Sequence, residues 1–294
     1  MSGEQPRYTE KVSYRFRHAI CNEIFQGWKF EEACKAIKKA GYEGIEIAPF
    51  TLSETPAAIT PAERNHYRSV MNSEGLEFVG LHWLMVAPKG LHVTTSDDVL
   101  RQKSWRHIDD LIDLCADLAG DRPHKGIMVF GSPQQRATQP GVSRNVAMRR
   151  YQDGLASVAR HAEQRNVTIL AESLPSNQCD VMNTLEEAVA IVNAIGSPAI
   201  QTMFDTHNAL DETDPHHVVL DRHFNLIRHI HVNEMDGKHP GKGDYDFKPI
   251  FEVLRRRNFQ GWVSLEAFDF SFGAEPIANE SLRHLEKEIQ KLPA

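Results

Sequence analysis

The segment Val167-Thr-Ile-Leu-Ala-Glu172-Ser173 is a short apolar run that ends in a carboxylate. Three more side chains able to bind a metal follow similar runs, namely Asp205, His231 and Glu266. The intervals between the four are 33, 26 and 35 residues, about the length of one strand-loop-helix-loop unit. Each side chain therefore falls at the same point of a repeating unit, which predicts a ring of parallel strands that share one site.

Strand and helix signals alternate along the whole chain. The predicted strands are 12–19, 44–47, 76–82, 126–131, 167–171, 200–204, 226–232 and 261–266. Helical spacing, with capping signals such as Thr60-Pro-Ala-Glu63 and Thr184-Leu-Glu-Glu187, fills the stretches between them. Eight alternations with no linker-like stretch predict a single (β/α)8 TIM barrel over residues 1–294, with residues 1–10 as a polar arm. No G-x-G-x-x-G motif follows an early strand, which disfavours an open dinucleotide-binding sheet.

Period-two alternation predicts which side chains face the barrel axis. His231 lies between Ile230 and Val232, so it points inward if these two face the surrounding helices. The same reasoning turns Glu172 inward. It applies equally to Asp205 and Glu266. All four are then expected at the carboxyl ends of their strands, where barrels of this kind place their chemistry.

The composition narrows the classes of partner and compartment. A net charge of −7 and a pI near 6.1 argue against a nucleic-acid partner, because phosphate backbones attract basic surfaces. The start of the chain is polar and resembles neither a signal nor a transit peptide, and no apolar run approaches the roughly 20 residues that cross a membrane. The 4 cysteines are far apart without C-x-x-C spacing. These features predict a cytoplasmic protein with reduced thiols and no membrane partner.

The four inward residues together predict a divalent metal ion. Each of them alone is as well explained by an ordinary ion pair. Three carboxylates in one cavity, however, raise one another's pKa unless a cation compensates them, and this disfavours a metal-free sugar-binding barrel. A site with mostly oxygen ligands and one imidazole suits Mn²⁺ first, and also Mg²⁺ or Co²⁺, with Zn²⁺ as a further alternative.

Other inward or nearby residues are candidates for contacts with a substrate. Glu46 ends the second predicted strand with the inward parity, and His82 ends the third. We expect both to line the cavity, although an ion pair at the barrel mouth and a structural hydrogen bond explain them equally well. Lys89 and Arg136 are candidates for binding a phosphate group, but no glycine-rich phosphate loop accompanies them.

Several motifs resemble the xylose isomerase-like sugar isomerases and epimerases, which include ketose 3-epimerases, hydroxypyruvate isomerase, inosose dehydratase and, more distantly, type IV AP endonucleases. The matching motifs are Ala171-Glu-Ser with Asn183-Thr-Leu-Glu-Glu-Ala, Phe204-Asp-Thr-His, His231-Val-Asn-Glu with Pro240-Gly-Lys-Gly, and Gly261-Trp-Val-Ser-Leu-Glu-Ala-Phe-Asp-Phe. The resemblance implies that Glu172 and Glu266 both bind the metal and transfer protons. It implies that Asp205 and His231 are the remaining ligands.

The residues that contact the substrate in ketose epimerases differ in this chain. Where those enzymes have a histidine three residues after the aspartate, this chain has Asn208, with His207 one place earlier. Their arginine six residues after the ligand histidine corresponds to Gly237, beside Lys238, and a substrate-binding glutamate corresponds to Gln178. The resemblance thus makes His207, Gln178 and Lys238 candidate substrate contacts and leaves the substrate itself open.

Three reaction classes follow from this resemblance. The first is isomerisation or epimerisation of a keto-sugar or related polyol through a metal-stabilised enediolate, with Glu172 and Glu266 as the acid/base pair. The second is a lyase or dehydratase that forms the same enediolate from a keto-sugar or 3-keto-glycoside and then eliminates a substituent. The third, hydrolysis of a phosphodiester as in the AP endonucleases, is less favoured because a second Asp-x-His pair is missing and the net charge is negative. Relatives of this kind also imply a homodimer or homotetramer.

Overall fold

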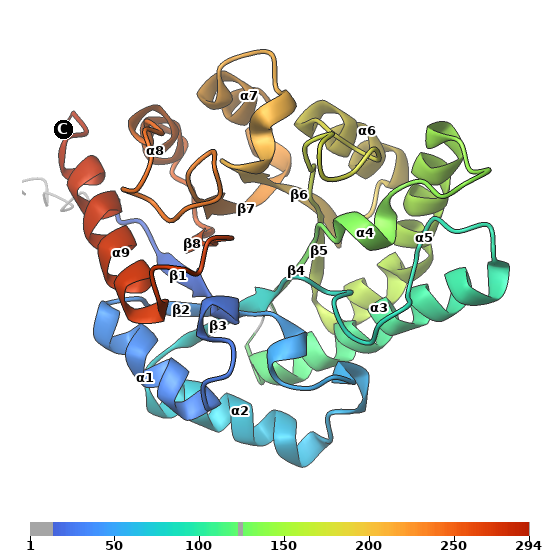
Figure 1. The fold of residues 1–294 in the computed structure, drawn as a ribbon, viewed down its shortest axis with the longest axis horizontal. Coiled ribbons are helices and arrows are strands. Elements are labelled where there is room, and N and C mark those ends of the chain that lie inside the picture. Colours follow the sequence, from blue (N-terminus) through green and yellow to red (C-terminus); the bar gives the residue numbers. More distant parts are fainter. Residues whose placement is uncertain (1–13, 123–125, 294) are drawn as a thin grey trace, which may run out of the picture.

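The computed structural model describes residues 14–122 and 126–293. Its centre is a closed barrel of parallel strands in chain order, in which β1 pairs with both β2 and β8 (Figure 1). The strands are β1 (His18–Cys21), β2 (Gly44–Ile47), β3 (Glu77–Leu81), β4 (Ile127–Phe130), β5 (Thr168–Ala171), β6 (Ile200–Asp205), β7 (Ile227–Val232) and β8 (Trp262–Leu265). The (β/α)8 barrel predicted from the sequence is confirmed.

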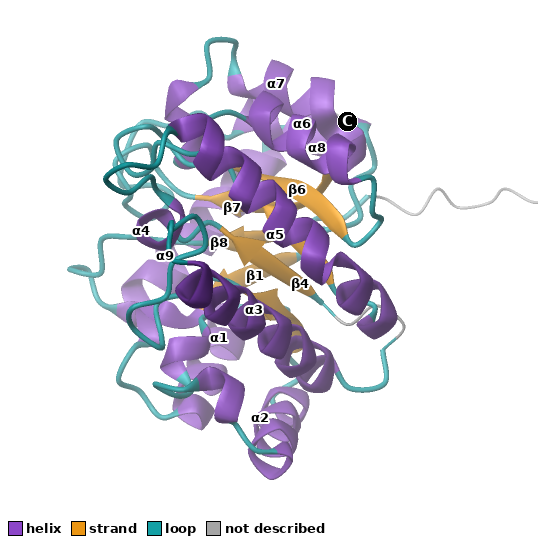
Figure 2. Ribbon diagram, turned by 90° about the vertical axis from the view of Figure 1, so that its right-hand side faces the viewer, coloured by secondary structure: helices purple, strands orange, loops and turns teal. Residues whose placement is uncertain are grey.

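Helices surround this barrel, as the side view in Figure 2 shows. The α-helices are α1 (Phe30–Ala40), α2 (Pro61–Ser73), α3 (Asp98–Ala119), α4 (Pro133–Arg136), α5 (Arg144–Arg165), α6 (Leu185–Ile195), α7 (His216–His223), α8 (Lys248–Arg256) and α9 (Ala274–Gln290). Short 3₁₀ turns are η1 (Asn22–Phe25), η2 (Pro49–Thr51), η3 (Pro56–Ala58), η4 (Asn208–Asp211) and η5 (Phe224–Leu226). No helix in the described ranges has both the length and the apolar character needed to cross a membrane.

The helix boundaries follow from local capping chemistry. Thr60 and Glu63 form a reciprocal capping box at the start of α2, and the Thr184 hydroxyl accepts a hydrogen bond from the backbone N–H of Glu187 at the start of α6. Gly41 ends α1 at a φ of 107°, a conformation that a side chain would strain. These boundaries agree with the sequence prediction. The predicted first strand and the polar arm lie partly or wholly outside the described residues.

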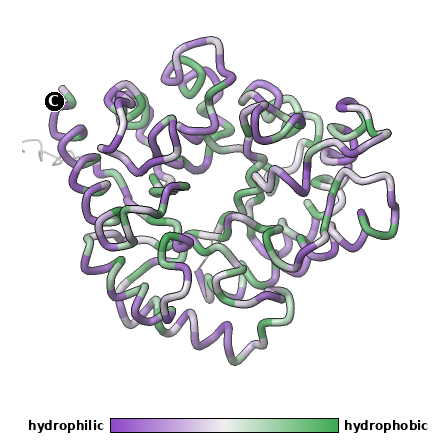
Figure 3. The backbone as a smooth tube through the Cα atoms, in the orientation of Figure 1, coloured by the Kyte–Doolittle hydropathy of each residue, from purple (hydrophilic) through white to green (hydrophobic). Residues whose placement is uncertain are grey.

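The strand side chains separate into two apolar sets, as period two predicts. A small set fills the barrel interior and consists of Ala19, Val79, Ile127, Val129, Leu170, Met203 and Trp262. The other set packs between barrel and helices, and it includes Ile230, Val232 and Leu265. In Figure 3 the outward faces of the surrounding helices are largely hydrophilic. Because Leu170 and Met203 are interior, the residues two places further along β5 and β6 also face the axis.

Candidate active site

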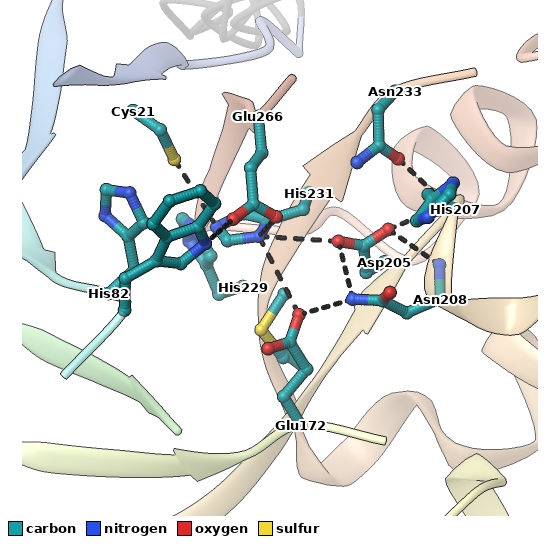
Figure 4. A network of polar contacts seen from close by, with 12 residues as sticks. Cys21, His82, Glu172, Asp205, His207, Asn208, His229, His231, Asn233 and Glu266 are labelled. Atoms are coloured by element: carbon teal, nitrogen blue, oxygen red, sulfur yellow. Dashed lines mark hydrogen bonds and ion pairs between the residues drawn. The ribbon is translucent and has the colours of Figure 1, made fainter. Parts of the chain in front are cut away.

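Four ionisable side chains meet at the carboxyl ends of neighbouring strands. Glu172 follows β5, Asp205 ends β6, His231 lies on β7 and Glu266 follows β8. One ligand atom from each lies within 4.8 Å of the others, and all four side chains are buried (Figure 4). The four residues that the sequence singles out therefore converge at one point.

His231 lies at the centre of this group. Its Nδ1 is 2.9 Å from Glu266 Oε2, 3.6 Å from Asp205 Oδ2 and 4.0 Å from Glu172 Oε1. The nitrogen and the nearest oxygen of each carboxylate thus face a common centre. We call these four residues the ligand cluster.

The ligand cluster carries more negative charge than its own residues compensate. Burial raises the pKa of Glu172 well above its usual range, and the charges of Glu266 and Asp205 raise it further. Burial also raises the pKa of Glu266, against the opposing charge of His231. Burial opposes ionisation of Asp205 as well, but the hydrogen bond and charge of His231 outweigh it and lower that pKa. The carboxylates therefore compete for one imidazole.

A divalent cation fits this donor set. The oxygens of three carboxylates and one imidazole nitrogen are already turned toward one another. A divalent cation between them would offset the negative charge of the carboxylates. Hard or borderline ions such as Mn²⁺, Mg²⁺ and Co²⁺ accept such oxygen-rich coordination. The chemistry of the residues present thus agrees with the metal that the sequence predicts.

A cavity of about 580 Å³ opens directly above the ligand cluster. It is lined by Trp83, Val86, Lys89, Gly131, Ser132, Pro133, Gln134, Gln135, Glu172, Leu174, Gln178, His207, Asn208, Asp236, Gly237, Glu266 and Phe268. Its volume is within the range of small-molecule sites. Of the residues predicted to contact a substrate, His207 and Gln178 are in this wall.

The His207 ring is fixed inside the cavity wall. Its Nδ1 lies 2.9 Å from the Met235 carbonyl oxygen and its Nε2 lies 3.2 Å from Nε2 of Gln178, so Nδ1–H donates to Met235 and Nε2 accepts from Gln178. The ring also packs on Phe268, with a centroid distance of 4.9 Å. Only the backbone N–H of His207 reaches the ligand cluster, donating to Asp205 Oδ1 at 2.7 Å.

Trp83 forms the aromatic side of the cavity and also contacts the ligand cluster. Its indole N–H donates to Glu266 Oε1 at 2.8 Å, and its ring stacks between Phe50 and Phe268. Its backbone φ of 49° lies in the left-handed region, which is costly for a bulky residue and occurs mainly at functional sites. Nothing in the sequence indicated the bond between Trp83 and Glu266.

Two residues adjust the position of the Glu172 carboxylate. The amide nitrogen of Asn208 donates to Glu172 Oε1 at 3.0 Å and to Asp205 Oδ2 at 3.2 Å. At Gly131, a Cβ atom would lie only 2.2 Å from Glu172 Oε2, so glycine leaves the space that this oxygen occupies. The sequence identified Asn208 only as a departure from the epimerase pattern, and Gly131 only as a strand end.

Three of the residues predicted to face the substrate lie elsewhere. Glu46 and His82 are fully buried and lie outside the residues that line the cavity, and they bond to His229 and Glu23 respectively. The ammonium group of Lys238 pairs with Asp236 at 2.6 Å and is also outside the cavity wall. Arg136, a candidate for binding phosphate, is buried and donates from Nη1 to the Glu172 carbonyl oxygen at 2.8 Å.

Comparisons with known proteins agree with this architecture. A family model described as xylose isomerase-like TIM barrel matches residues 34–288. A probable ketose 3-epimerase of Synechocystis sp. is 26% identical over 269 residues, covering 88% of this chain and 85% of the relative. An inosose dehydratase of Clostridium tetani is 23% identical over 146 residues, or 42% of this chain and 48% of the relative. The crystal structure of a 3-keto-D-glucoside 4-epimerase from E. coli is similar in fold, with a TM-score of 0.79 at 19% identity over 93% of this chain and 100% of that one.

Proposed function

Because the chain belongs to the xylose isomerase-like TIM barrel family, we propose that it is a divalent-metal-dependent isomerase or epimerase of a keto-sugar or related polyol. The observation that carries the proposal is the convergence of the ligand cluster, within 4.8 Å, at the floor of the 580 Å³ cavity. The relative named as a probable ketose 3-epimerase, which aligns over 88% of this chain, supports the same reaction class.

The proposed reaction begins with removal of a proton from the carbon beside a ketone. Such a proton is far too weakly acidic for an unaided carboxylate, because the resulting enediolate places negative charge on oxygen. A divalent ion held by the ligand cluster would supply positive charge to the carbonyl oxygen and the adjacent hydroxyl oxygen. The residues of the chain then have to orient the substrate and move the proton.

Glu172 and Glu266 suit the two proton-transfer roles. Each has one oxygen near His231 Nδ1, and each has a second oxygen that is further from the imidazole. The second oxygen of Glu172 lies against Gly131 in the cavity wall, whereas that of Glu266 accepts the Trp83 hydrogen bond. Since β5 and β8 stand three strands apart in the ring, the two carboxylates can address opposite faces of a planar enediolate. Removal on one face and return on the other inverts the carbon.

The cavity wall also suits a sugar. Trp83 and Phe268 place aromatic rings in the wall, and Gln178 and His207, which are bonded to each other, add polar groups to it. A sugar ring carries both C–H faces and hydroxyl groups, so a wall that is partly aromatic and partly polar can contact both. We propose His207 and Gln178 as the substrate-binding pair.

A lyase is the second candidate, and the similarity to an inosose dehydratase favours it. It would use the same proton removal, followed by loss of water or of an aglycone from the neighbouring carbon. Phosphodiester hydrolysis is less well supported by the cavity. Among its lining residues in the described part of the chain, Lys89 is the one permanent cation, whereas three carboxylates, Glu172, Asp236 and Glu266, line the same cavity.

Exchange with heavy water tests the proposal. The metal-free protein is reloaded with Mn²⁺, Mg²⁺ or Co²⁺ and incubated in D₂O with a panel of ketoses and 3-keto-glycosides, and deuterium at carbon is followed by NMR after removal of the paramagnetic ion. We expect metal-dependent exchange, of which the Glu172→Gln variant loses the exchange of the proton that faces Glu172 and keeps that of the proton that faces Glu266, without inversion. Exchange without elimination supports the epimerase, and release of water or of an aglycone supports the lyase. Absence of exchange from every substrate at saturating metal would contradict both.

A further inference from the structure

A second set of buried ionisable side chains adjoins the ligand cluster. We call it the deep layer, and it consists of Glu23, Glu46, His82 and His229. All four are at most 1% exposed. Glu23 Oε2 lies 2.7 Å from His82 Nε2, and Glu46 Oε2 lies 2.8 Å from His229 Nε2. Each carboxylate of the deep layer is therefore bonded to an imidazole of the same layer.

His231 is the residue that joins the two layers. Its Nδ1 faces the three carboxylates of the ligand cluster, while its Nε2 lies 3.1 Å from Glu46 Oε1. Cys21 Sγ, at 3.8 Å from the same Nε2, is a more distant and weaker neighbour. The Glu46 carboxylate thus accepts hydrogen bonds from two imidazoles, one through each of its oxygens.

This contact decides which nitrogen of His231 faces the cavity. A neutral imidazole carries a hydrogen on one ring nitrogen and a lone pair on the other, and only the lone pair can bind a metal. A carboxylate is an acceptor, so the nitrogen that faces Glu46 must carry a hydrogen. Nδ1 also faces a carboxylate, Glu266 at 2.9 Å, and a metal ion bound in the ligand cluster would take the place of any hydrogen on that nitrogen. Nε2 is then the donor, and the lone pair of Nδ1 points to the centre of the ligand cluster. The other tautomer, with its hydrogen on Nδ1, would place an acceptor against Glu46, and turning the ring over would place a C–H group there.

We infer that Glu46 is a positioning residue, which fixes the ring orientation and tautomer of His231 so that Nδ1 is offered to the metal. The inference rests on the proposed function in so far as that function requires a metal in the ligand cluster. Glu46 itself is held by the second hydrogen bond, from His229 Nε2. Residues that orient a ligand histidine in this way commonly contribute about 10- to 100-fold to metal affinity.

Glutamine at position 46 offers a specific test because of its asymmetry. The Gln side chain has one oxygen and one NH₂ group, so it can accept from only one of the two imidazoles. If its NH₂ faces His231, Nε2 must become the acceptor and the hydrogen moves to Nδ1, where it blocks the metal. If its NH₂ faces His229, that contact is kept only when the hydrogen of His229 moves to Nδ1, which has no hydrogen-bond partner among the described residues, and the orientation of residue 46 is less strictly fixed.

Glu23→Gln is the matched control. It makes the same carboxylate-to-amide change at an equally buried site, but its partner is His82 and not a member of the ligand cluster. We expect Glu46→Gln to weaken Mn²⁺ binding by about 10- to 100-fold in calorimetric titration. For Glu23→Gln we expect a change of less than about threefold. Circular dichroism and thermal unfolding establish whether each variant is folded.

NMR provides a second measurement that needs no variant at Glu46. The wild-type protein is labelled with ¹⁵N at histidine and loaded with diamagnetic Mg²⁺. The His231 signal is assigned by its loss in His231→Gln. Its ¹⁵N shifts report which ring nitrogen carries the hydrogen. We expect a hydrogen-bonded Nε2–H of His231 that exchanges slowly with water. In a folded Glu46→Gln variant this signal should move or exchange faster, and in Glu23→Gln it should stay.

Two results would overturn the inference about Glu46. One is a metal affinity in folded Glu46→Gln that equals that of the wild-type protein. Equal losses of metal affinity in Glu46→Gln and Glu23→Gln would count in the same way, because they would reveal a general effect of changing a buried carboxylate. The other is a hydrogen on Nδ1 of His231 in the Mg²⁺-loaded protein. Failure of the wild-type protein to bind any divalent ion would instead contradict the proposed function, so the two failures are distinguishable.

Discussion

The ligand cluster and the deep layer contain the same kinds of side chain in opposite electrostatic states. In the ligand cluster three carboxylates surround one imidazole nitrogen, and burial raises the pKa of Glu172 well above its usual range. In the deep layer the carboxylates and imidazoles are equal in number and bonded to one another. Burial opposes ionisation of Glu46 too, but the charges of His231 and His229 outweigh it and hold its pKa well below the usual range.

The difference shows that buried ionisable groups do not by themselves indicate a metal site. The group formed by Cys21, Glu23 and His82 also has ligand atoms within 4.8 Å of one another, but Glu23 and His82 compensate each other through a 2.7 Å contact. The ligand cluster lacks such internal compensation and opens to a cavity. It is the layer that needs an external cation, while the deep layer serves to orient it.

The largest effect should come from replacing a carboxylate of the ligand cluster. Glu172→Gln or Glu266→Gln removes a proton-transfer group, which lowers turnover by about 10²- to 10⁴-fold even at saturating metal. Glu46→Gln should differ in kind, since excess Mn²⁺ restores its activity by occupying the weakened site. Steady-state rates measured across a range of metal concentrations separate the two cases.

Metal content has to be measured in these variants, because Glu172 and Glu266 are also proposed ligands. Near wild-type turnover in a fully metallated Glu172→Gln would show that this carboxylate only binds metal. If excess metal fully restored the activity of Glu172→Gln or Glu266→Gln, the distinction between the ligand cluster and the deep layer would no longer hold.

The second effect concerns pH. Because burial and neighbouring charges raise the pKa of Glu172, and burial raises that of Glu266, protons remain on these groups at pH values where ordinary carboxyls have lost them. Protons then compete with the metal, so apparent metal affinity should rise with pH by about tenfold per unit for each proton displaced, until the pH exceeds the raised pKa. Isothermal titration calorimetry of metal binding, repeated in buffers of different ionisation enthalpy, gives the number of protons released when the metal binds. Affinity that is constant between pH 5 and 8 would contradict the raised pKa values.

A smaller effect is expected at Trp83. Trp83→Phe keeps an aromatic ring between Phe50 and Phe268 but removes the hydrogen bond to Glu266 Oε1. A hydrogen bond to a charged group contributes about 1.5 kcal/mol or more, which corresponds to about a tenfold loss of turnover. Phe50→Leu is the control, since it disturbs the stack and leaves that bond in place. Equal losses in the two variants would assign Trp83 a packing role only.

The smallest effect is expected at His207. His207→Ala keeps the backbone N–H that donates to Asp205 Oδ1, so metal content should be unchanged. Loss of one side-chain contact to the substrate, about 1 kcal/mol, should lower kcat/KM roughly fivefold. Elemental analysis of the purified variant measures its metal content, and steady-state kinetics measure its kcat/KM. Metal loss in this variant would place His207 among the residues that support the ligand cluster.

The fold and the ligand cluster could be predicted because both depend on regular repetition. Caps such as Thr60 with Glu63 fix the ends of helices locally. Period two fixes the direction of side chains once a strand is recognised. The convergence of Glu172, Asp205, His231 and Glu266 follows from a closed ring in which every strand ends at the same face. The first predicted strand, 12–19, began too early: residues 14–17 are not in a strand, β1 runs from His18 to Cys21, and residues 12 and 13 lie outside the described ranges.

The depth of a side chain along the barrel axis could not be predicted. Glu46 and His82 are buried, as their inward parity predicts, but they bond to His231 and Glu23 and do not line the cavity. Parity gives the direction of a side chain and not its height, which depends on the stagger between strands. Contacts such as Trp83 with Glu266 join residues 183 positions apart, and no local pattern encodes them.

One measurement tests the difference between the two layers directly. Crystals of the wild-type protein soaked in Mn²⁺ are measured at a wavelength at which manganese scatters anomalously. We expect one anomalous peak, within about 2.0–2.6 Å of His231 Nδ1 and of oxygens from at least two of the carboxylates of the ligand cluster. A peak between Cys21, Glu23 and His82, or no peak in the ligand cluster at saturating Mn²⁺, would contradict the account.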